Sequence, residues 1–194
     1  VVIGGYDTVY NDSYVEGGVF GGCISMTNVV FGSALTTIHG QAFTKCSSLE
    51  RIVIPDSVRK IGPQCFWKCT NVLEILIGKG VLSIGEKAFY GCSNAKRVVF
   101  SEQDNPQLMI GAYAFGYCTG MEDVQFSNSL TNISEYAFQY CQALKRVDIP
   151  DSVKLISWGA FANSTSLGEA VIGDGVVVIG GYDTVYNDSY VEGG

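Results

Sequence analysis

A phenylalanine recurs along this chain at an almost constant interval, and no other feature restricts the possible folds so strongly. The residues are Phe20, Phe43, Phe66, Phe89, Phe115, Phe138 and Phe161, at intervals of 23, 23, 23, 26, 23 and 23 residues. From Phe43 onwards an isoleucine stands five residues before each of them. A cysteine stands three residues after every one except Phe161, which is followed by Ser164. A period of this length is typical of repeat proteins, in which each turn packs against the next.

The segment that follows each cysteine has apolar residues at alternate positions, which predicts a strand. Ile52 and Ile54 in LERIVIP and Val147 and Ile149 in LKRVDIP are examples. One short strand per turn has no partner within its own turn, so it must pair in parallel with the equivalent strand of the next turn. The sequence therefore predicts one β-solenoid domain over residues 1–194, with about seven turns and one parallel sheet.

The outward positions of these strands carry charges whose sign alternates from turn to turn. They are Arg51, Glu74, Arg97, Asp123, Arg146 and Glu169. Like charges on directly opposed residues are destabilising, whereas this order gives each charge an opposite neighbour in both adjacent turns if the strands are in register. Exposed ion pairs contribute only ~0.2–1 kcal/mol each, so the column indicates the register more than it stabilises the fold.

Two segments carry a more specific pattern, IPDSVRKIGPQCFWKCTNVLEI at 54–75 and IPDSVKLISWGAFANSTSL at 149–167. Their IPxSVxxI, AF and CxxL elements within a 23-residue period resemble the BspA-like leucine-rich repeat, and the resemblance covers residues 20–179. It implies a right-handed leucine-rich-repeat solenoid, with irregular or short helical turns opposite the sheet. It also implies a surface or secreted protein of bacteria or of some protists, several of which bind host matrix proteins or other cells.

The first turn contains an insertion, GYDTVYNDSYVEGG, that makes it twelve residues longer than the frame requires. Bulky and polar residues alternate on either side of Asn11-Asp12, which predicts a β-hairpin in which residues 6–10 pair with residues 13–15. The tyrosines of the insertion are Tyr6, Tyr10 and Tyr14. Tyrosine is enriched at protein interfaces, so these rings are candidates for assembly or partner contacts. The alternative is a loop that packs back on its own turn.

The eighteen residues at positions 1–18 recur without change at 177–194, an offset of 176 residues. The second copy supplies Tyr182, Tyr186 and Tyr190 as further candidate contacts. The offset implies a larger repeat of seven turns. It can belong to a long tandem protein, which we favour, to a self-polymerising subunit with matched ends, or to an engineered overlap. In each case the last turn of one unit receives the first turn of another, and neither end has the polar capping turn of a free solenoid.

The net charge of −7 is unevenly distributed. Each copy of the duplicated segment has three carboxylates and no lysine or arginine, so the two copies account for −6 and the rest of the chain for −1. The chain has no basic surface for nucleic acid, no polybasic patch for anionic lipid, and no run of eighteen apolar residues that would span a membrane. We therefore expect neither nucleic-acid binding nor membrane insertion.

The residue types needed for catalysis or for metal binding do not occur in a suitable pattern. His39 is the only imidazole, no CxxC pair is present, and no GxSxG, P-loop or paired-carboxylate motif occurs. Asp7, Asp12 and Glu16 lack the dense alternation of a calcium loop. We expect no catalytic, cofactor-binding or metal-binding residues and a chain that is not an enzyme.

The spacing of the cysteines is that of the repeat, which predicts buried thiols in one inward column. Cysteines in neighbouring turns would also lie within disulfide range, so bridges between turns stay open as an alternative in an oxidising compartment. Four asparagines head an N-x-S/T triplet and would be glycosylation sites in a eukaryotic secreted protein. They are Asn11, Asn132, Asn163 and Asn187.

Two functions follow from these features. The first is a structural repeat protein, a unit of an extracellular or cell-surface fibre whose partner is itself, joined head to tail and with lateral contacts from the hairpin. The alternative is a cell-surface adhesin that binds a host matrix or cell-surface protein through its strand face. The outward apolar column that includes Val53 and Leu76, between Val30 and Val99, would form that contact.

Overall fold

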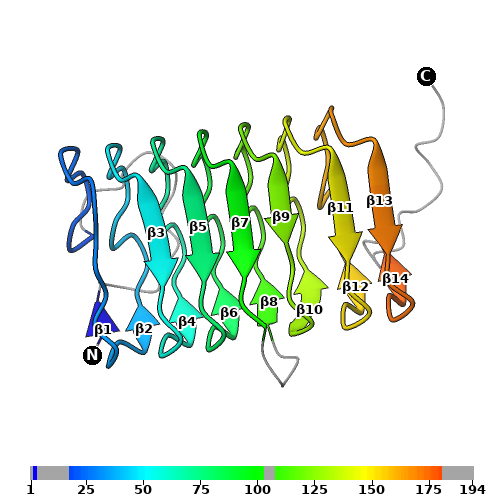
Figure 1. Cartoon of the computed structure of the whole chain (residues 1–194), viewed down its shortest axis with the longest axis horizontal. Coiled ribbons are helices and arrows are strands. Elements are labelled where there is room, and N and C mark those ends of the chain that lie inside the picture. The colour runs from blue at the N-terminus through cyan, green and yellow to red at the C-terminus, as the bar shows by residue number, and fades with distance from the viewer. Residues whose placement is uncertain (1, 4–17, 103–107, 181–194) are drawn as a thin grey trace, which may run out of the picture.

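The computed structural model describes residues 2–3, 18–102 and 108–180, and it is a rod in which successive turns of the chain lie side by side (Figure 1). A row of longer strands and a row of shorter strands run along the rod, from β1 at one end to β14 at the other. This arrangement confirms the predicted β-solenoid. The hairpin predicted for residues 6–15 lies outside the described residues.

The shorter strands form one eight-stranded parallel sheet. In spatial order they are β1 (Val2–Ile3), β2 (Thr37–Ile38), β4 (Lys60–Ile61), β6 (Ser83–Ile84), β8 (Leu108–Ile110), β10 (Leu130–Ile133), β12 (Leu155–Ile156) and β14 (Val178–Ile179). Each strand ends in an isoleucine, and those from β2 to β12 precede a phenylalanine by five residues. These isoleucines are register partners in adjacent turns, as Ile38 and Ile61 are. The isoleucine column of the sequence is therefore the inner row of this sheet.

The longer strands are the ones predicted from the alternating pattern after each cysteine. They are β3 (Arg51–Ile54), β5 (Glu74–Ile77), β7 (Arg97–Phe100) and β9 (Asp123–Gln125) in a four-stranded sheet, and β11 (Arg146–Ile149) and β13 (Glu169–Ile172) in a two-stranded sheet. All are parallel, and the predicted register is confirmed within each sheet, where Arg51 pairs with Glu74 and Arg146 with Glu169. The two sheets divide between β9 and β11, so the predicted pairing of Asp123 with Arg146 stays a prediction.

The solenoid thus carries parallel strands on two sides, whereas the sequence predicted one sheet facing irregular or helical turns. No segment of the described ranges is helical. The short strands were not predicted because most of them have only two residues, which is too few to show an alternation of apolar and polar positions.

The third side consists of the phenylalanine turns, and residues with positive φ recur at fixed positions in its backbone. From Phe43 to Phe161, the residues two before and two after each phenylalanine of the column have positive φ, for example Gln64 at 53° and Lys68 at 55° on either side of Phe66. Left-handed backbone costs ~1–2 kcal/mol for a residue other than glycine. Hydrogen bonds to the adjacent turn offset this cost, because the N–H groups of Gln64, Phe66 and Lys68 all donate to carbonyls of the next turn at 2.7–2.9 Å.

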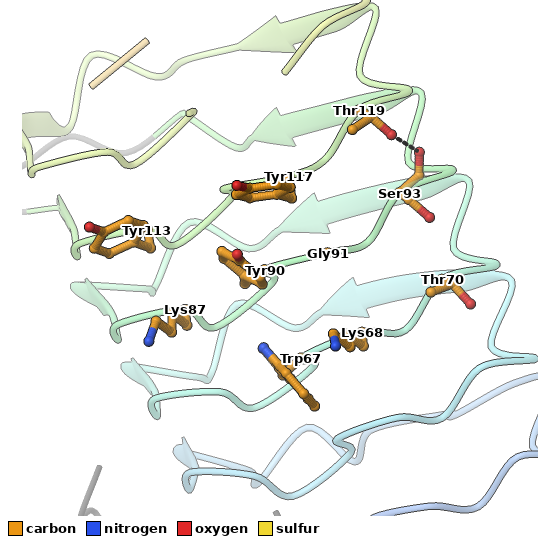
Figure 2. Close-up of a pocket in the computed structure, with 10 residues that line it drawn as sticks. All are labelled: Trp67, Lys68, Thr70, Lys87, Tyr90, Gly91, Ser93, Tyr113, Tyr117 and Thr119. Carbon is orange, nitrogen blue, oxygen red and sulfur yellow. Dashed lines mark hydrogen bonds between the residues drawn. The ribbon is translucent and has the colours of Figure 1, made fainter. Parts of the chain in front are cut away.

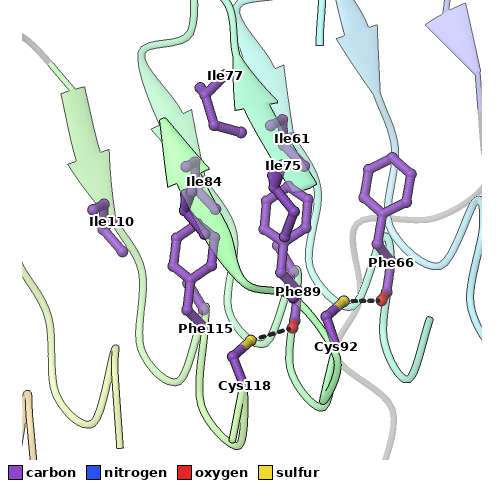
Figure 3. Close-up of a cluster of buried hydrophobic side chains, with 14 of the residues drawn as sticks. Ile61, Phe66, Ile75, Ile77, Ile84, Phe89, Cys92, Ile110, Phe115 and Cys118 are labelled. Carbon is purple, nitrogen blue, oxygen red and sulfur yellow. Dashed lines mark hydrogen bonds between the residues drawn. The ribbon is translucent and has the colours of Figure 1, made fainter. Parts of the chain in front are cut away.

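A stack of phenylalanine rings fills the centre of the rod. Neighbouring rings of the column lie nearly parallel, with centroids 5.0–5.3 Å apart from Phe20 through to Phe161. Phe66, Phe89 and Phe115 are fully buried and face the inward isoleucines of both strand rows (Figure 3). Each turn therefore contributes one ring to a core that is continuous along the rod.

The cysteine column lies beside the rings, and its thiols bond to the backbone. Cys92 donates to the Phe66 carbonyl at 3.4 Å and Cys118 to the Phe89 carbonyl at 3.3 Å (Figure 3). Ser164, the one exception in the column, donates to the equivalent Phe138 carbonyl at 3.0 Å. All seven cysteines are free thiols, and five of the six in the column are buried, which confirms the prediction of an inward thiol column. The sixth, Cys23, is partly buried, and Cys65 is buried outside the column. No bridge joins one turn to another in this structure.

The Phe89→Ala variant should lose about 3–5 kcal/mol of unfolding free energy, because it opens a cavity in the middle of the ring stack. Phe20→Ala should lose less, since Phe20 is already 37% exposed at the end of the stack. Urea unfolding of both variants, followed by circular dichroism, measures the difference. Equal losses for the two variants would contradict the role of burial within the stack.

The buried thiols make stability fall at alkaline pH. Burial raises the pKa of Cys92 from 9.0 to about 12. Its contribution to stability is therefore fully present below pH 9 and is lost as the pH rises towards 12. Relative to a Cys92→Ser variant, the wild type should lose about 1.4 kcal/mol for each pH unit in this window. Urea unfolding at several pH values checks this, and parallel pH profiles for the two proteins would refute it.

Candidate functional site

The turn side of the rod carries a groove of about 740 Å³. Its side chains come from the turns around Phe66, Phe89 and Phe115, so it spans three successive turns near the middle of the rod (Figure 2). The larger lining residues are Trp67, Lys68, Lys87, Tyr90, Tyr113 and Tyr117. At its rim the hydroxyl of Thr119 donates to the Ser93 carbonyl at 3.4 Å.

The repeating backbone explains why these side chains gather. Each phenylalanine points inward, and several of the left-handed residues two positions before or after it, such as Lys68 and Tyr117, are exposed, although Gln64 is buried. Lys68 and Tyr117 occupy the same place in different turns, and Gly91 lies between them with φ of 72°. Gly91 has no side chain, so this outward column is interrupted at that turn and the groove opens above it (Figure 2).

One wall of the groove is the start of a series of aromatic ring contacts, of which Tyr113–Tyr136 is stacked, Tyr90–Tyr117 and Tyr117–Tyr140 are tilted, and Tyr136–Trp158 is edge-to-face. Ring centroids are separated by 5.1 Å for Tyr90 and Tyr117, 4.5 Å for Tyr117 and Tyr140, 4.8 Å for Tyr113 and Tyr136, and 4.9 Å for Tyr136 and Trp158. Such ring pairs contribute ~0.5–1.5 kcal/mol beyond the burial of their area. The wall is therefore an ordered aromatic surface.

The opposite wall combines a tryptophan with ammonium groups. The Nζ atoms of Lys68 and Lys45 lie 4.3 and 5.5 Å from the centre of the Trp67 ring, and Lys87 Nζ lies 5.7 Å from the Tyr113 ring. The indole of Trp67 is only 6% exposed, and its Nε1 is buried without a hydrogen-bond partner. This wall therefore offers positive charge and one unpaired donor.

The strand face carries the apolar column that the sequence predicted. Val53, Leu76 and Val99 are register partners in β3, β5 and β7, and Val53 is 43% exposed. The charged column runs beside them, where Arg51 Nε contacts Glu74 at 2.9 Å and Arg97 contacts Asp123 at 3.4 Å. The structure therefore brings Val53 and Leu76 together on one surface.

The other predicted site residues are the contact tyrosines and the candidate glycosylation sites, and only some of them lie in the described part of the chain. Asn132 lies partly buried in β10, and Asn163 is exposed in a turn with φ of 58°. The others, Tyr6, Tyr10, Tyr14, Tyr182, Tyr186, Tyr190, Asn11 and Asn187, lie outside the described residues.

In the described part of the chain, no group of three or more histidine, cysteine, aspartate or glutamate side chains is arranged to hold a metal ion. His39 follows β2 at the position that glycine or serine fills in most other turns. Among the same residues, no helix has the length and apolar character needed to cross a lipid bilayer.

The groove was not predicted from the sequence, although a signal for it was present. Tyrosines stand two residues before and after both Phe115 and Phe138, a symmetry that no earlier turn repeats. These positions differ in type from turn to turn, so they do not stand out as part of the frame. Their proximity becomes evident only when the turns are stacked in register.

Comparison with known proteins agrees with this geometry. A model of the BspA type leucine-rich repeat region, in six copies, matches residues 13–109 and 104–187. The chain is similar to the crystal structure of a leucine-rich repeat protein from Eubacterium ventriosum, with 28% identity and a TM-score of 0.64. It also shares its fold with the pneumococcal vaccine antigen PcpA, with 21% identity and a TM-score of 0.54.

These likenesses cover 72% and 76% of this chain, but only 37% and 46% of the two solved chains. The chain therefore spans less than half the length of either protein. No curated protein shows a significant match to the sequence. The family model covers most of the chain in two overlapping stretches. These stretches contain the phenylalanine, isoleucine and cysteine columns described above. The chain belongs to the BspA-type leucine-rich-repeat family.

Proposed function

We propose that this chain is a non-enzymatic structural unit of a cell-surface or extracellular solenoid that continues head to tail with further copies of itself. Membership of the BspA-type family supports the location, because the family is typical of surface and secreted proteins. The absence of a chemical motif in the sequence supports a scaffold role.

The observation that carries the proposal is that one sequence forms both edges of the eight-stranded sheet. Val2–Ile3 forms β1, and the identical Val178–Ile179 forms β14. β1 pairs with Thr37–Ile38, which follows it along the rod, whereas β14 pairs with Leu155–Ile156, which precedes it. β14 therefore carries a sequence that pairs with Thr37–Ile38 within the chain, and it can take the place of β1 beside Thr37–Ile38 of a further copy.

The backbone hydrogen bonds indicate how the added copy would bind. Along this sheet the carbonyl of each isoleucine accepts from the residue that follows the isoleucine of the next turn, as Ile156 accepts from Gly180 at 2.8 Å. Ile179 is the next acceptor of the column, and none of the described residues donates to it. With β14 in the place of β1, Ile179 would lie beside Ile38 of the added copy, as Ile3 does within the chain.

The inward columns would continue across the same contact. Phe20 is 37% exposed at one end of the ring stack, and Phe161 is partly buried at the other. Phe20 of the added copy occupies the next position after Phe161, and Cys23 then faces the Phe161 carbonyl as the other column cysteines face theirs. Ile172 and Ile179, which are 41% and 66% exposed, would be covered.

The Ile172→Lys variant should not associate, because the contact would bury an unpaired ammonium group at a cost of several kcal/mol. Static light scattering of the purified chain should show a mass that rises with concentration for the wild type. We expect association at least about tenfold weaker for the variant, which corresponds to 1.4 kcal/mol or more.

The matched control is Leu73→Lys, which places the same charge at a residue that is 52% exposed in the middle of the rod. It should associate as the wild type does. A wild-type mass that stays at one chain at every concentration, or an Ile172→Lys variant that associates normally, would reject head-to-tail stacking.

A second candidate function is adhesion through the strand face. Val53, Leu76 and Val99 form a continuous apolar strip across three strands in register, beside a column of paired charges. An apolar strip with a polar border is a typical docking surface for a protein. A host matrix or cell-surface protein is the partner that family membership favours.

Adhesion predicts that the double variant Val53→Asp/Leu76→Asp loses binding to immobilised extracellular-matrix proteins by at least about tenfold, because carboxylates replace the apolar contact. Its unfolding midpoint in urea should stay close to that of the wild type, since both side chains point outward. Surface plasmon resonance measures the binding, with Leu73→Asp as the control. Wild-type binding by the double variant would exclude this strip as the adhesive surface.

A further inference from the structure

The aromatic groove on the turn side has no role in head-to-tail stacking, and its shape follows from a missing side chain. The outward column reads Lys68, Gly91, Tyr117 and Tyr140 in successive turns. The rings of Tyr117 and Tyr140 are 4.5 Å apart, and the series ends where Gly91 provides no ring. The Tyr117 and Tyr140 rings are inclined at 30°, and Tyr90 contacts Tyr117 at 5.1 Å with an angle of 43°. The groove of about 740 Å³ has room for one further ring beside Gly91, which has no side chain of its own (Figure 2).

The charge of the groove favours a negatively charged ligand. Lys68 and Lys87 line it, Lys45 lies next to Trp67, and none of the lining residues is an aspartate or glutamate. One carboxylate contacts a lysine of the groove: an oxygen of Glu86 lies 3.7 Å from Lys87 Nζ. This concentration of lysine contrasts with the net charge of −7 of the whole chain.

An unpaired donor in the wall of the groove adds a second requirement for the ligand. Trp67 lines the groove, and its Nε1 is buried without a hydrogen-bond partner. An indole N–H is only a donor, and leaving it unsatisfied costs ~1–3 kcal/mol. The preferred ligand therefore combines an aromatic ring, a negative charge and an acceptor oxygen close together.

The duplicated segment of this chain has that combination. Each copy contains three tyrosines and three carboxylates without a lysine or arginine, and a tyrosine directly precedes an aspartate in Tyr6-Asp7 and in Tyr182-Asp183. We infer that the groove binds this segment from a second copy of the chain, with a tyrosine ring above Gly91 and the adjacent carboxylate against Lys68. The inference rests on the proposed self-association and adds a lateral contact to it.

A synthetic peptide of residues 5–16, GYDTVYNDSYVE, tests the inference directly. Added in excess to a Trp158→Phe variant, it should change the fluorescence of Trp67 in a saturable way, and the effect should weaken as salt is added. A control peptide with Asp7→Asn, Asp12→Asn and Glu16→Gln should bind at least about tenfold more weakly.

The groove itself is tested by Gly91→Tyr, which supplies the missing ring from within the chain. The same left-handed position holds a tyrosine in Tyr117 and Tyr140, so this variant should fold, and only the flexible Lys68 side chain would need to shift. We expect at least about tenfold weaker peptide binding, and the same for Lys68→Glu. Lys79→Glu, an equal change of charge on an exposed residue away from the groove, should bind as the wild type does.

The groove and the end contact can fail independently. The Ile172→Lys variant should still bind the peptide, which separates the groove from head-to-tail stacking. Absence of a saturable signal, or equally tight binding by Gly91→Tyr, overturns the inference even if the chain still associates end to end. Saturable binding of polygalacturonate without binding of the peptide also overturns it and would assign the groove to an acidic polysaccharide.

Discussion

Contact between equivalent residues of adjacent turns is the interaction on which the rest of this structure depends. The strands have two to four residues each and pair only with strands of neighbouring turns. The phenylalanine rings stack from turn to turn, and the thiols of the cysteine column donate to carbonyls of the preceding turn. No turn has enough internal contacts to fold alone, so each is stabilised by the turns on both sides. For the same reason, the strands at the edges of the stack present unpaired backbone groups that can bind another copy.

The sequence predicted what this stacking requires of the inward positions. Phe66, Phe89 and their equivalents recur because each ring packs on the rings of both neighbouring turns, at centroid distances of 5.0–5.3 Å. The alternating charges gave the register of the long strands for the same reason, since opposed residues in parallel strands are direct neighbours. Ser164 makes the same hydrogen bond as the cysteines of its column, because its hydroxyl replaces the thiol as the donor to a phenylalanine carbonyl.

The outward positions were harder to predict, because the stacking does not fix their residue type. The left-handed positions hold Gln64, Lys68, Tyr113 and Asn163 at different turns, and all adopt the same backbone. The groove depends on which of these residues are neighbours across turns, above all on Gly91 between Lys68 and Tyr117. That proximity is a property of the three-dimensional stack and not of any local segment. The short strands were missed for a different reason, since two residues cannot show a period.

Left-handed residues other than glycine commonly indicate a functional site, because such strain persists only where the surroundings impose it. In this chain they occur at the same two positions of every described phenylalanine turn from Gln41 to Asn163, with glycine at some of them. Here the strain belongs to the frame and carries no functional information by itself. Its consequence is indirect, because several of these positions, such as those of Lys68 and Tyr117, place a side chain at the surface beside a buried ring. A surface of aromatic and basic residues can therefore vary from turn to turn without disturbing the core, and the two proposed contacts draw on different forces. The end contact relies on apolar burial and backbone pairing, whereas the groove relies on lysine charge, which salt screens.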